Sequence, residues 1–234
     1  MTGAPRAVGI LGGMGPEATV EFMRRIVKAT PARGDADHIR MLVDSNPQVP
    51  SRIEHLIEKR GQDPGPTLAD MARRLEGDGA RFLAIPCNTA HYYLDQVKRS
   101  VGIPVLDMVD LTMRHLKDAG VASIGLLASP AVTATQLFDR RGAEHGVRVL
   151  HPVAEDRAAV LAAIRAVKAS GPTPAELDAY RAVVRRLAAA GAERLVIACT
   201  ELSLVAVPDE LTSRTLDSLD VLVEAVVRTA TEAS

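Results

Sequence analysis

The chain has 234 residues, enough for one large domain or two small ones, and 47% of them are hydrophobic, which supplies an ample core. The formal net charge is −1, and the arginines occur as scattered doublets without a basic stripe interleaved with aromatics, so we expect no nucleic-acid partner. No apolar run approaches a membrane span, and residues 1–6 lack a signal-peptide pattern. We therefore expect a soluble cytoplasmic protein without a membrane partner.

Short apolar runs alternate with helical patterns along the chain. The strand candidates, in chain order, are Ala7–Leu11, Arg40–Val43, Phe82–Ile85, Ser123–Leu127 and Arg194–Ala198, with Val105–Leu106 and Val147–Leu150 as weaker ones. The helical patterns cover Pro16–Ala29, Thr67–Glu76, Ala90–Val101, Ala158–Ala169, Pro174–Ala189 and Leu216–Thr231. This alternation predicts an α/β fold in which helices cover both faces of parallel sheets.

A glycine-rich turn, Gly12-Gly13-Met14-Gly15-Pro16, follows the first strand and opens a helix. Pro16 suits the first helical position, and backbone N–H groups at such a turn favour an anion. The spacing also fits a dinucleotide fingerprint, but Asp44 comes later than the acid which that fold requires. A carboxylate or phosphate site and a plain tight turn are the two main interpretations.

Parts of the two halves repeat. Val8–Gly13 resembles Ile124–Ser129, and the segment Gly79–Thr89, which contains Cys87, resembles Gly191–Glu201, which contains Cys199. The repeat predicts two similar α/β domains that face each other across a cleft, with the crossover near Val105–Asp110.

These two cysteines are the only ones in the chain, and each follows an apolar run that is typical of a buried strand. A single free cysteine is usually a small buried hydrophobe, but two in repeated frames, each followed by polar residues, indicate function. A disulfide is disfavoured in a reducing compartment, and zinc lacks a third clustered ligand. His91, four residues after Cys87, leaves open either a Cys–His nucleophile pair or a histidine that bonds backbone or carboxylate.

Two thiols that face each other across a cleft suit inversion at a carbon acid. One thiolate removes a proton from one face, and the opposite thiol donates a proton to the other face. Because an unperturbed thiol has a pKa of about 8.5, the site must favour one ionisation and disfavour two. Asn88, Thr89 and Thr200, with the nearby loop amides, are placed to stabilise the carbanion at its α-carboxylate.

Three segments resemble the signatures of the aspartate/glutamate racemase superfamily, in its aspartate racemase branch: Gly12-Gly13-Met14-Gly15-Pro16, Pro86-Cys87-Asn88-Thr89-Ala90-His91 and Ala198-Cys199-Thr200-Glu201-Leu202. The resemblance implies an amino-acid racemase that needs no cofactor and no metal, acts on aspartate, uses Cys87 and Cys199 as acid and base, and forms a homodimer. It also implies two α/β domains related by a pseudo-twofold axis with the active site between them. The last helix would return to the first domain, giving boundaries of 1–106 plus 209–234 and of 107–208.

The same resemblance extends to four further substrate-binding residues. Arg52, in the segment 46–52, is similar to an arginine that binds the distal carboxylate, and Lys168, in the segment 164–171, would lie near the substrate. Met14 belongs to the first signature. Glu201 would orient a motif or meet the substrate ammonium.

The sequence departs from the family pattern at Ser51, at Arg165 and in the segment Ser129–Val132, where one hydroxyl is missing. These departures leave the two-cysteine chemistry intact and bear on the substrate. Glutamate or broad-specificity racemases, hydantoin racemases, maleate isomerases and decarboxylases of the same scaffold therefore remain alternatives. A non-catalytic carboxylate-binding protein is another, and a dinucleotide oxidoreductase is the weakest.

Overall fold

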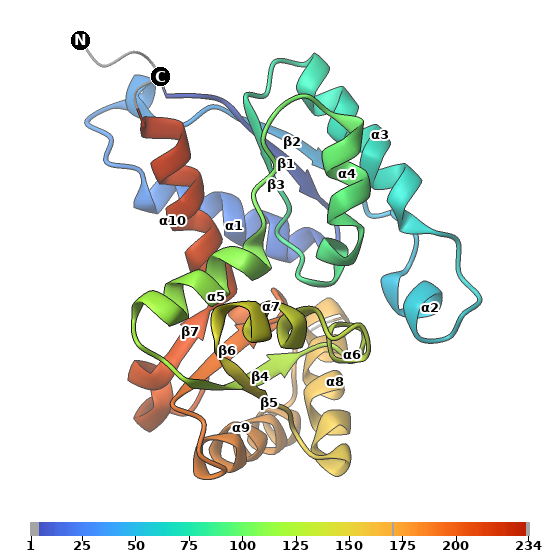
Figure 1. The fold of residues 1–234 in the computed structure, drawn as a ribbon, viewed down its shortest axis with the longest axis vertical. Coiled ribbons are helices and arrows are strands. Elements are labelled where there is room, and N and C mark those ends of the chain that lie inside the picture. Colours follow the sequence, from blue (N-terminus) through green and yellow to red (C-terminus); the bar gives the residue numbers. More distant parts are fainter. Residues whose placement is uncertain (1–4, 170, 233–234) are drawn as a thin grey trace.

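The computed structural model describes residues 5–169 and 171–232. Two parallel sheets lie one above the other in Figure 1, with strand orders β2-β1-β3 and β5-β4-β6-β7. The strands are β1 (Val8–Gly12), β2 (Met41–Ser45), β3 (Phe82–Ala84), β4 (Ser123–Ala128), β5 (Arg148–Leu150), β6 (Arg194–Ala198) and β7 (Thr215–Asp217). The predicted α/β class with two parallel sheets is confirmed.

Helices pack on both faces of each sheet, and their apolar sides form the separate parts of the core. The α-helices are α1 (Pro16–Ala29), α2 (Arg52–Leu56), α3 (Pro64–Gly77), α4 (Leu94–Ser100), α5 (Met108–Asp118), α6 (Pro130–Ala134), α7 (Leu137–His145), α8 (Ala154–Ala169), α9 (Pro174–Ala189) and α10 (Ser218–Thr231). The 3₁₀ turns are η1 (Asp35–Asp37), η2 (Thr89–Tyr93), η3 (Leu202–Leu204) and η4 (Asp209–Arg214). Within the described ranges, no helix has both the length and the apolar character needed to cross a membrane.

The sequence repeat reappears as a repeat of topology. β1 and β4, which carry the similar glycine-containing segments, are the second strand in each sheet order, and β3 and β6, which precede the two cysteines, are the third. Beyond β3, Val105 forms an isolated parallel bridge with Leu83, where the second sheet has the complete strand β7. The two cysteines therefore follow corresponding strands.

A Leu-Asp pair lies at the end of this fourth position in both halves, directly before a helix: Leu106-Asp107 follows Val105, and Leu216-Asp217 ends β7. Asp107 caps α5 by accepting from the backbone N–H of Asp110, and Asp217 caps α10 by accepting from that of Leu219. A carboxylate at this position satisfies N–H groups that lack a helical partner. α5 and α10 then pack against each other between the two sheets.

The last helix packs on the side of the first sheet. α10 packs against α1, and its apolar residues share a core with Val8, Ile10 and Phe22. The start of the returning segment differs from the boundary expected at residue 209, because Leu216 of β7 pairs with Val196 of β6 and so extends the second sheet. The chain therefore returns only from α10, and the other domain limits stay a prediction.

Candidate active site

The glycine-rich turn closes tightly against the loop that follows β2. Gly13 has a φ of +87°, and a Cβ there would lie 2.3 Å from the carbonyl carbon of Asn46, so only glycine fits. Its N–H donates to the hydroxyl of Thr19 at 2.9 Å, and Pro16 takes the first turn of α1. For Gly13 the structure thus favours the tight-turn interpretation over an anion ligand. The turn brings the start of α1 beside the loop that carries Arg52.

A cavity of about 180 Å³ lies between the two sheets and contains both thiols in its wall. We call it the thiol cavity; it is lined by Met14, Ser51, Arg52, Ile53, Cys87, Asn88, Thr89, Ser129, Ile164, Lys168, Cys199, Thr200 and Glu201. All nine residues that we expected at the site from the sequence therefore line the thiol cavity. Both cysteines are reduced and almost fully buried.

Each cysteine sits at the entrance to a 3₁₀ turn. β3 ends at Ala84, and the N–H of Cys87 then donates to the carbonyl of Ile85 at 2.8 Å, which turns the chain sharply before η2. Cys199 follows β6 directly, and its carbonyl accepts from Leu202 at 2.9 Å as η3 begins. Because the loops after β3 and β6 correspond, one thiol reaches the cavity from each half.

His91 supports the backbone beside Cys87. Its Nε2 accepts from the N–H of Met108 at 3.0 Å, so Nδ1 carries the proton and donates to the carbonyl of Cys87 at 2.9 Å. Burial lowers the pKa of His91, which keeps the ring neutral. With both nitrogens bonded to backbone groups, the ring is not placed to act as base for the thiol, and the Cys–His pair is wrong for this arrangement.

Cys199, Glu201 and Lys168 form a connected polar group. The thiol of Cys199 donates to Oε2 of Glu201 at 3.0 Å, and Oε1 of Glu201 lies 2.5 Å from Nζ of Lys168. Burial, and then the negative charge of Glu201, raise the pKa of Cys199 well above its ordinary value, while Lys168 lowers it by a smaller effect. The unliganded site therefore holds Cys199 as a thiol.

Polar groups around Cys87 form the opposite wall of the cavity. The hydroxyls of Thr89 and Ser129 are 3.0 Å apart, and Nδ2 of Asn88 donates to the hydroxyl of Ser218 at 3.1 Å. In this amide orientation, the buried Oδ1 of Asn88 has no partner among the described residues. Thr200 is buried nearby. Hydroxyl and amide groups thus gather where a small anion could be bound.

Arg52 begins α2 and is held by the carbonyls of its surroundings. Its guanidinium donates to the carbonyls of Pro50 at 3.0 Å, Met14 at 3.2 Å and Val49 at 3.3 Å. These bonds hold the cation in the cavity wall without a carboxylate partner among the residues that the structure describes.

The departures from the family pattern lie at different distances from the thiol cavity, and only some of them can contact a ligand there. Ser51 lines the cavity and also caps α2, whereas Val132 is fully buried in the core and Arg165 is exposed outside the cavity. The hydroxyl lost at position 132 is therefore not replaced there, but the same segment brings the hydroxyl of Ser129, which sequence reasoning did not nominate, into the cavity wall. Its signal was the serine followed by Pro130, which is typical of a helix start.

A larger cavity of about 620 Å³ adjoins the thiol cavity, and we call it the vestibule. The two share Met14, Ser51, Arg52, Lys168 and Glu201, and the vestibule has apolar walls from Pro47, Val49, Pro50, Val167 and Leu204. Gly15 lies at this boundary, and a Cβ there would be 3.5 Å from Oε1 of Glu201. A bound ligand with a side chain too long for the thiol cavity could therefore extend past Glu201 into the vestibule.

The site shows no grouping suited to a metal within residues 5–169 and 171–232, where no three histidine, cysteine, aspartate or glutamate side chains converge. The chemistry available is that of two thiols, one of them bonded to a carboxylate, beside cations and hydroxyls. Such a set can move protons at an acidic carbon.

The paired sheets and the cysteine of each half in one cavity define a two-domain α/β protein with a double-thiol site. The chain belongs to the Asp/Glu/Hydantoin racemase family, whose family model matches residues 11–226. It is 28% identical over 151 residues to a broad specificity amino-acid racemase of Bacillus subtilis (strain 168). That match covers 62% of this chain and 63% of the relative, so it spans somewhat less than two thirds of either protein.

Solved structures of two other proteins are similar to this fold over nearly the whole chain. An aspartate racemase from Picrophilus torridus is 27% identical, with a TM-score of 0.82, covering 96% of this chain and 94% of that one. An aspartate racemase homologue from Pyrococcus horikoshii OT3 shares the fold at 20% identity and a TM-score of 0.76, covering 97% of this chain and 100% of that one. Together these findings put the chain in the aspartate racemase branch of the superfamily.

Proposed function

We propose that this protein is a cofactor-independent racemase that interconverts L- and D-aspartate by proton transfer between Cys87 and Cys199. The observation that carries the proposal is that both thiols line one 180 Å³ cavity from corresponding loops of the two halves. Two acid/base groups from opposite sides of a cavity are what inversion at a single carbon requires.

The protonation state of Cys199 supports one assignment of roles. Because burial and Glu201 hold Cys199 protonated, we take it as the donor in one direction and Cys87 as the base that removes the α-proton. When the proton has moved, Cys87 is a thiol and Cys199 a thiolate, which is the state that accepts the opposite enantiomer. The two forms of the enzyme therefore alternate with the two enantiomers.

The charged and polar groups suit an acidic amino acid. Arg52 and Lys168 supply cations for the side-chain carboxylate, and Thr89 and Thr200, with Asn88 beside them, supply donors for the α-carboxylate. Stabilising the α-carboxylate as it takes up carbanion charge lowers the barrier to proton removal. Glu201 is left for the substrate ammonium, whose positive charge would favour ionisation of the adjacent Cys199.

A second candidate is a racemase of broader specificity. The open boundary between the thiol cavity and the vestibule favours it, because longer side chains could pass Gly15. The relative in Bacillus subtilis, which carries that description, also favours it. The two candidates share the same thiol chemistry and differ only in what the vestibule accepts.

The decisive experiment incubates the purified protein with L-aspartate in deuterated water without pyridoxal phosphate. We expect D-aspartate carrying deuterium at the α-carbon, and racemisation lost by at least about a thousandfold in each of Cys87→Ser and Cys199→Ser. Unchanged melting temperatures would show that the variants are folded. Full racemisation by either serine variant would contradict the two-base mechanism. If no acidic amino acid exchanged its α-hydrogen for deuterium, the proposal of an acidic amino acid as substrate would be wrong.

A further inference from the structure

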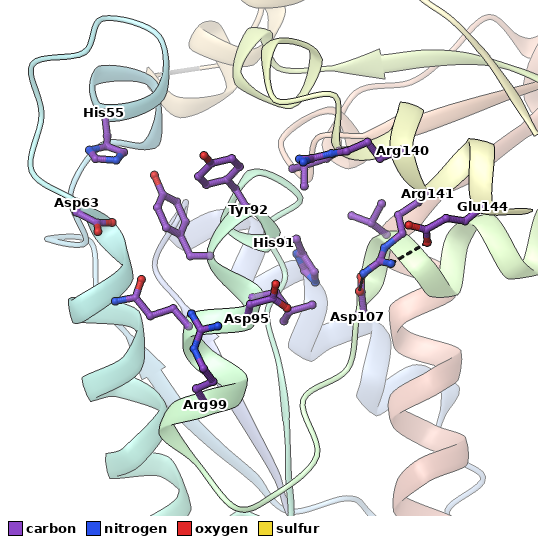
Figure 2. A pocket seen from close by; sticks show the side chains of 15 residues that line it. His55, Asp63, His91, Tyr92, Asp95, Arg99, Asp107, Arg140, Arg141 and Glu144 are labelled. Atoms are coloured by element: carbon purple, nitrogen blue, oxygen red, sulfur yellow. Dashed lines mark hydrogen bonds and ion pairs between the residues drawn. The ribbon is translucent and has the colours of Figure 1, made fainter.

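A third cavity, of about 690 Å³, lies on the other side of the Cys87 loop, between η2–α4 of the first half and α7 of the second. Figure 2 shows this space, which we call the interdomain groove. Among the described residues, none that lines it also lines the thiol cavity or the vestibule. The groove is thus separate from the site described above, and its volume falls within the range of small-molecule sites, about 300–1,000 Å³.

One buried hydroxyl in the groove lacks a partner. Tyr93 is only 5% exposed, it lines the groove, and its hydroxyl has no hydrogen-bond partner among the described residues. Burial and the charge of Asp63 raise its pKa, so the group is a neutral O–H that can donate. Because buried polar groups are normally paired, this hydroxyl points to a ligand.

The charges that remain available in the groove are balanced. Arg141 is already paired with Asp107 at 3.0 Å and with Glu144 at 2.8 Å. Within the described part of the chain, the other charged side chains of the groove form no ion pair: Arg99, Arg140, Asp63 and Asp95. Asp63 does accept from the N–H of Gly65 and Arg140 donates to the carbonyl of Thr135, but neither bond neutralises a charge. Two cations and two carboxylates outside ion pairs favour a ligand that carries one charge of each sign over a polyanion.

An aromatic surface lies among these charges. Tyr92 is 46% exposed, and its ring meets Tyr93 edge to face at 5.2 Å. In the view of Figure 2, Tyr92 lies between His55 and Arg140, and Asp95 and Arg99 lie below it on the same η2–α4 side of the groove. A half-exposed tyrosine offers a ring on which an aromatic ligand can pack.

We propose that the interdomain groove is a second binding site, for a zwitterionic aromatic compound of which an aromatic amino acid is the simplest member. Its carboxylate would meet Arg99 or Arg140, its ammonium would meet Asp63 or Asp95, and its ring would pack on Tyr92. The hydroxyl of Tyr93 then gains the partner that it lacks. Neither the double-thiol chemistry nor the identity of the racemase substrate enters this assignment.

Two short elements connect the groove with the thiol cavity. α2 begins with Arg52 in the cavity and carries His55 to the groove, and η2 begins with Thr89 in the cavity and ends with Tyr93 at the groove. A ligand that fixes either element also fixes a residue of the active site.

Calorimetric titration of the purified protein with L-tryptophan tests the proposal without reference to activity. We expect one bound molecule per chain, with affinity at least about tenfold weaker for tryptamine and for indole-3-propionate, each of which lacks one charge. Tyr93→Phe should weaken L-tryptophan binding about fivefold and Arg99→Ala about tenfold. Arg148→Ala, which changes an exposed arginine outside the groove, should leave it unchanged.

The outcomes separate the groove from the active site. If Thr200→Ala weakened L-tryptophan binding and Tyr93→Phe did not, the compound would occupy the thiol cavity and the proposal would be wrong. No binding to the wild-type protein, or equal binding of tryptophan and tryptamine, would also overturn it. Circular dichroism of Tyr93→Phe and Arg99→Ala confirms the fold, which neither change threatens because one keeps the buried ring and the other alters an exposed side chain.

Discussion

Glu201 has a double effect on the thiol next to it. Its carboxylate accepts the hydrogen bond of Cys199 and, after burial, is the largest cause of the raised pKa of that thiol. Its other oxygen is paired with Lys168, which limits the effect because a nearby cation favours the thiolate. The resting protonation of Cys199 thus follows first from its burial and then from the balance of one carboxylate and one ammonium.

Glu201→Gln removes the negative charge and leaves the shape. We expect the pKa of Cys199 to fall, so that its thiolate appears at lower pH, because both the repulsion and the charged hydrogen-bond acceptor are lost. Ultraviolet thiolate absorbance, titrated in a Cys87→Ser background, measures this. Lys168→Met is the opposite control and should raise the pKa of Cys199 further. If the pKa of Cys199 changed in the same direction in both variants, the opposing effects assigned to Glu201 and Lys168 would be wrong.

Gly15 controls the opening between the thiol cavity and the vestibule. Its φ of −103° and ψ of 168° are open to any residue, so the backbone does not require glycine there. We expect Gly15→Val to lower kcat/KM for glutamate about tenfold more than for aspartate, since added methyl groups would narrow the passage beside Glu201 and Lys168. Racemisation assays with both substrates give the ratio. Gly34→Val, where a Cβ meets nothing within 4 Å, should not change it.

The two cysteines were predictable because their signals are local, whereas Arg52 and Lys168 were nominated through the family resemblance. Cys87 and Cys199 follow apolar runs that form buried strands, and the repeat places them at corresponding positions. The contribution of Ser129 was not predictable, because its hydroxyl reaches Thr89 only after the two halves fold together. The bond from His91 to Met108 likewise depends on where α5 begins.

At the scale of elements, His91 is the link between η2 and α5. It joins the carbonyl of Cys87 to the N–H that opens α5, at the level where the two halves meet. Burial lowers its pKa in the folded state, whereas in the unfolded chain it titrates near pH 6.5. Below that pH the unfolded chain binds a proton that the folded chain does not, so stability is lost as the pH falls.

We expect the free energy of unfolding to decline below about pH 6.5 with a contribution from His91 of up to about 1.4 kcal/mol per pH unit. His91→Gln should remove that contribution and lower stability at pH 7 by about 2 kcal/mol, because one backbone partner loses its bond. Urea denaturation at several pH values measures both. His115→Gln, on α5, replaces a histidine outside this link and should keep the wild-type slope. A slope unchanged by His91→Gln would refute the assignment.

Long amphipathic helices were predictable and short elements were not. Pro16–Ala29 and Pro174–Ala189 match α1 and α9, because a proline at the start and a sustained apolar face mark them. β7 has only three residues, all half-buried, which is too few for an alternating strand pattern to be recognised. The helix predicted over Leu216–Thr231 therefore included the end of β7. α5 was missed, although Asp107 provides the same cap that Asp217 provides for α10.

For the molecule as a whole, the two halves are joined by packing and by a partly buried ion network centred on Arg25. Arg25 of α1 contacts Asp217 and Asp220 at 2.7 Å each, and it donates to the carbonyl of Ser203 at 3.0 Å. It thus ties the first sheet's helix to the end of β7, to α10 and to the turn that follows Glu201. Its own helix supplies Glu21 as a further partner.

Removing this arginine should loosen the connection between the halves. In Arg25→Met, Asp217 stays buried without its cation, so we expect a loss of about 3–5 kcal/mol in the free energy of unfolding. Arg24→Met is the matched control, because the Arg24 side chain is 63% exposed and pairs with Glu21, and such surface pairs contribute less than about 1 kcal/mol. Urea denaturation of both variants gives the comparison. Equal losses would mean that the contact between α1 and the second half is carried by the apolar core alone, and that Asp217 finds other partners when Arg25 is gone.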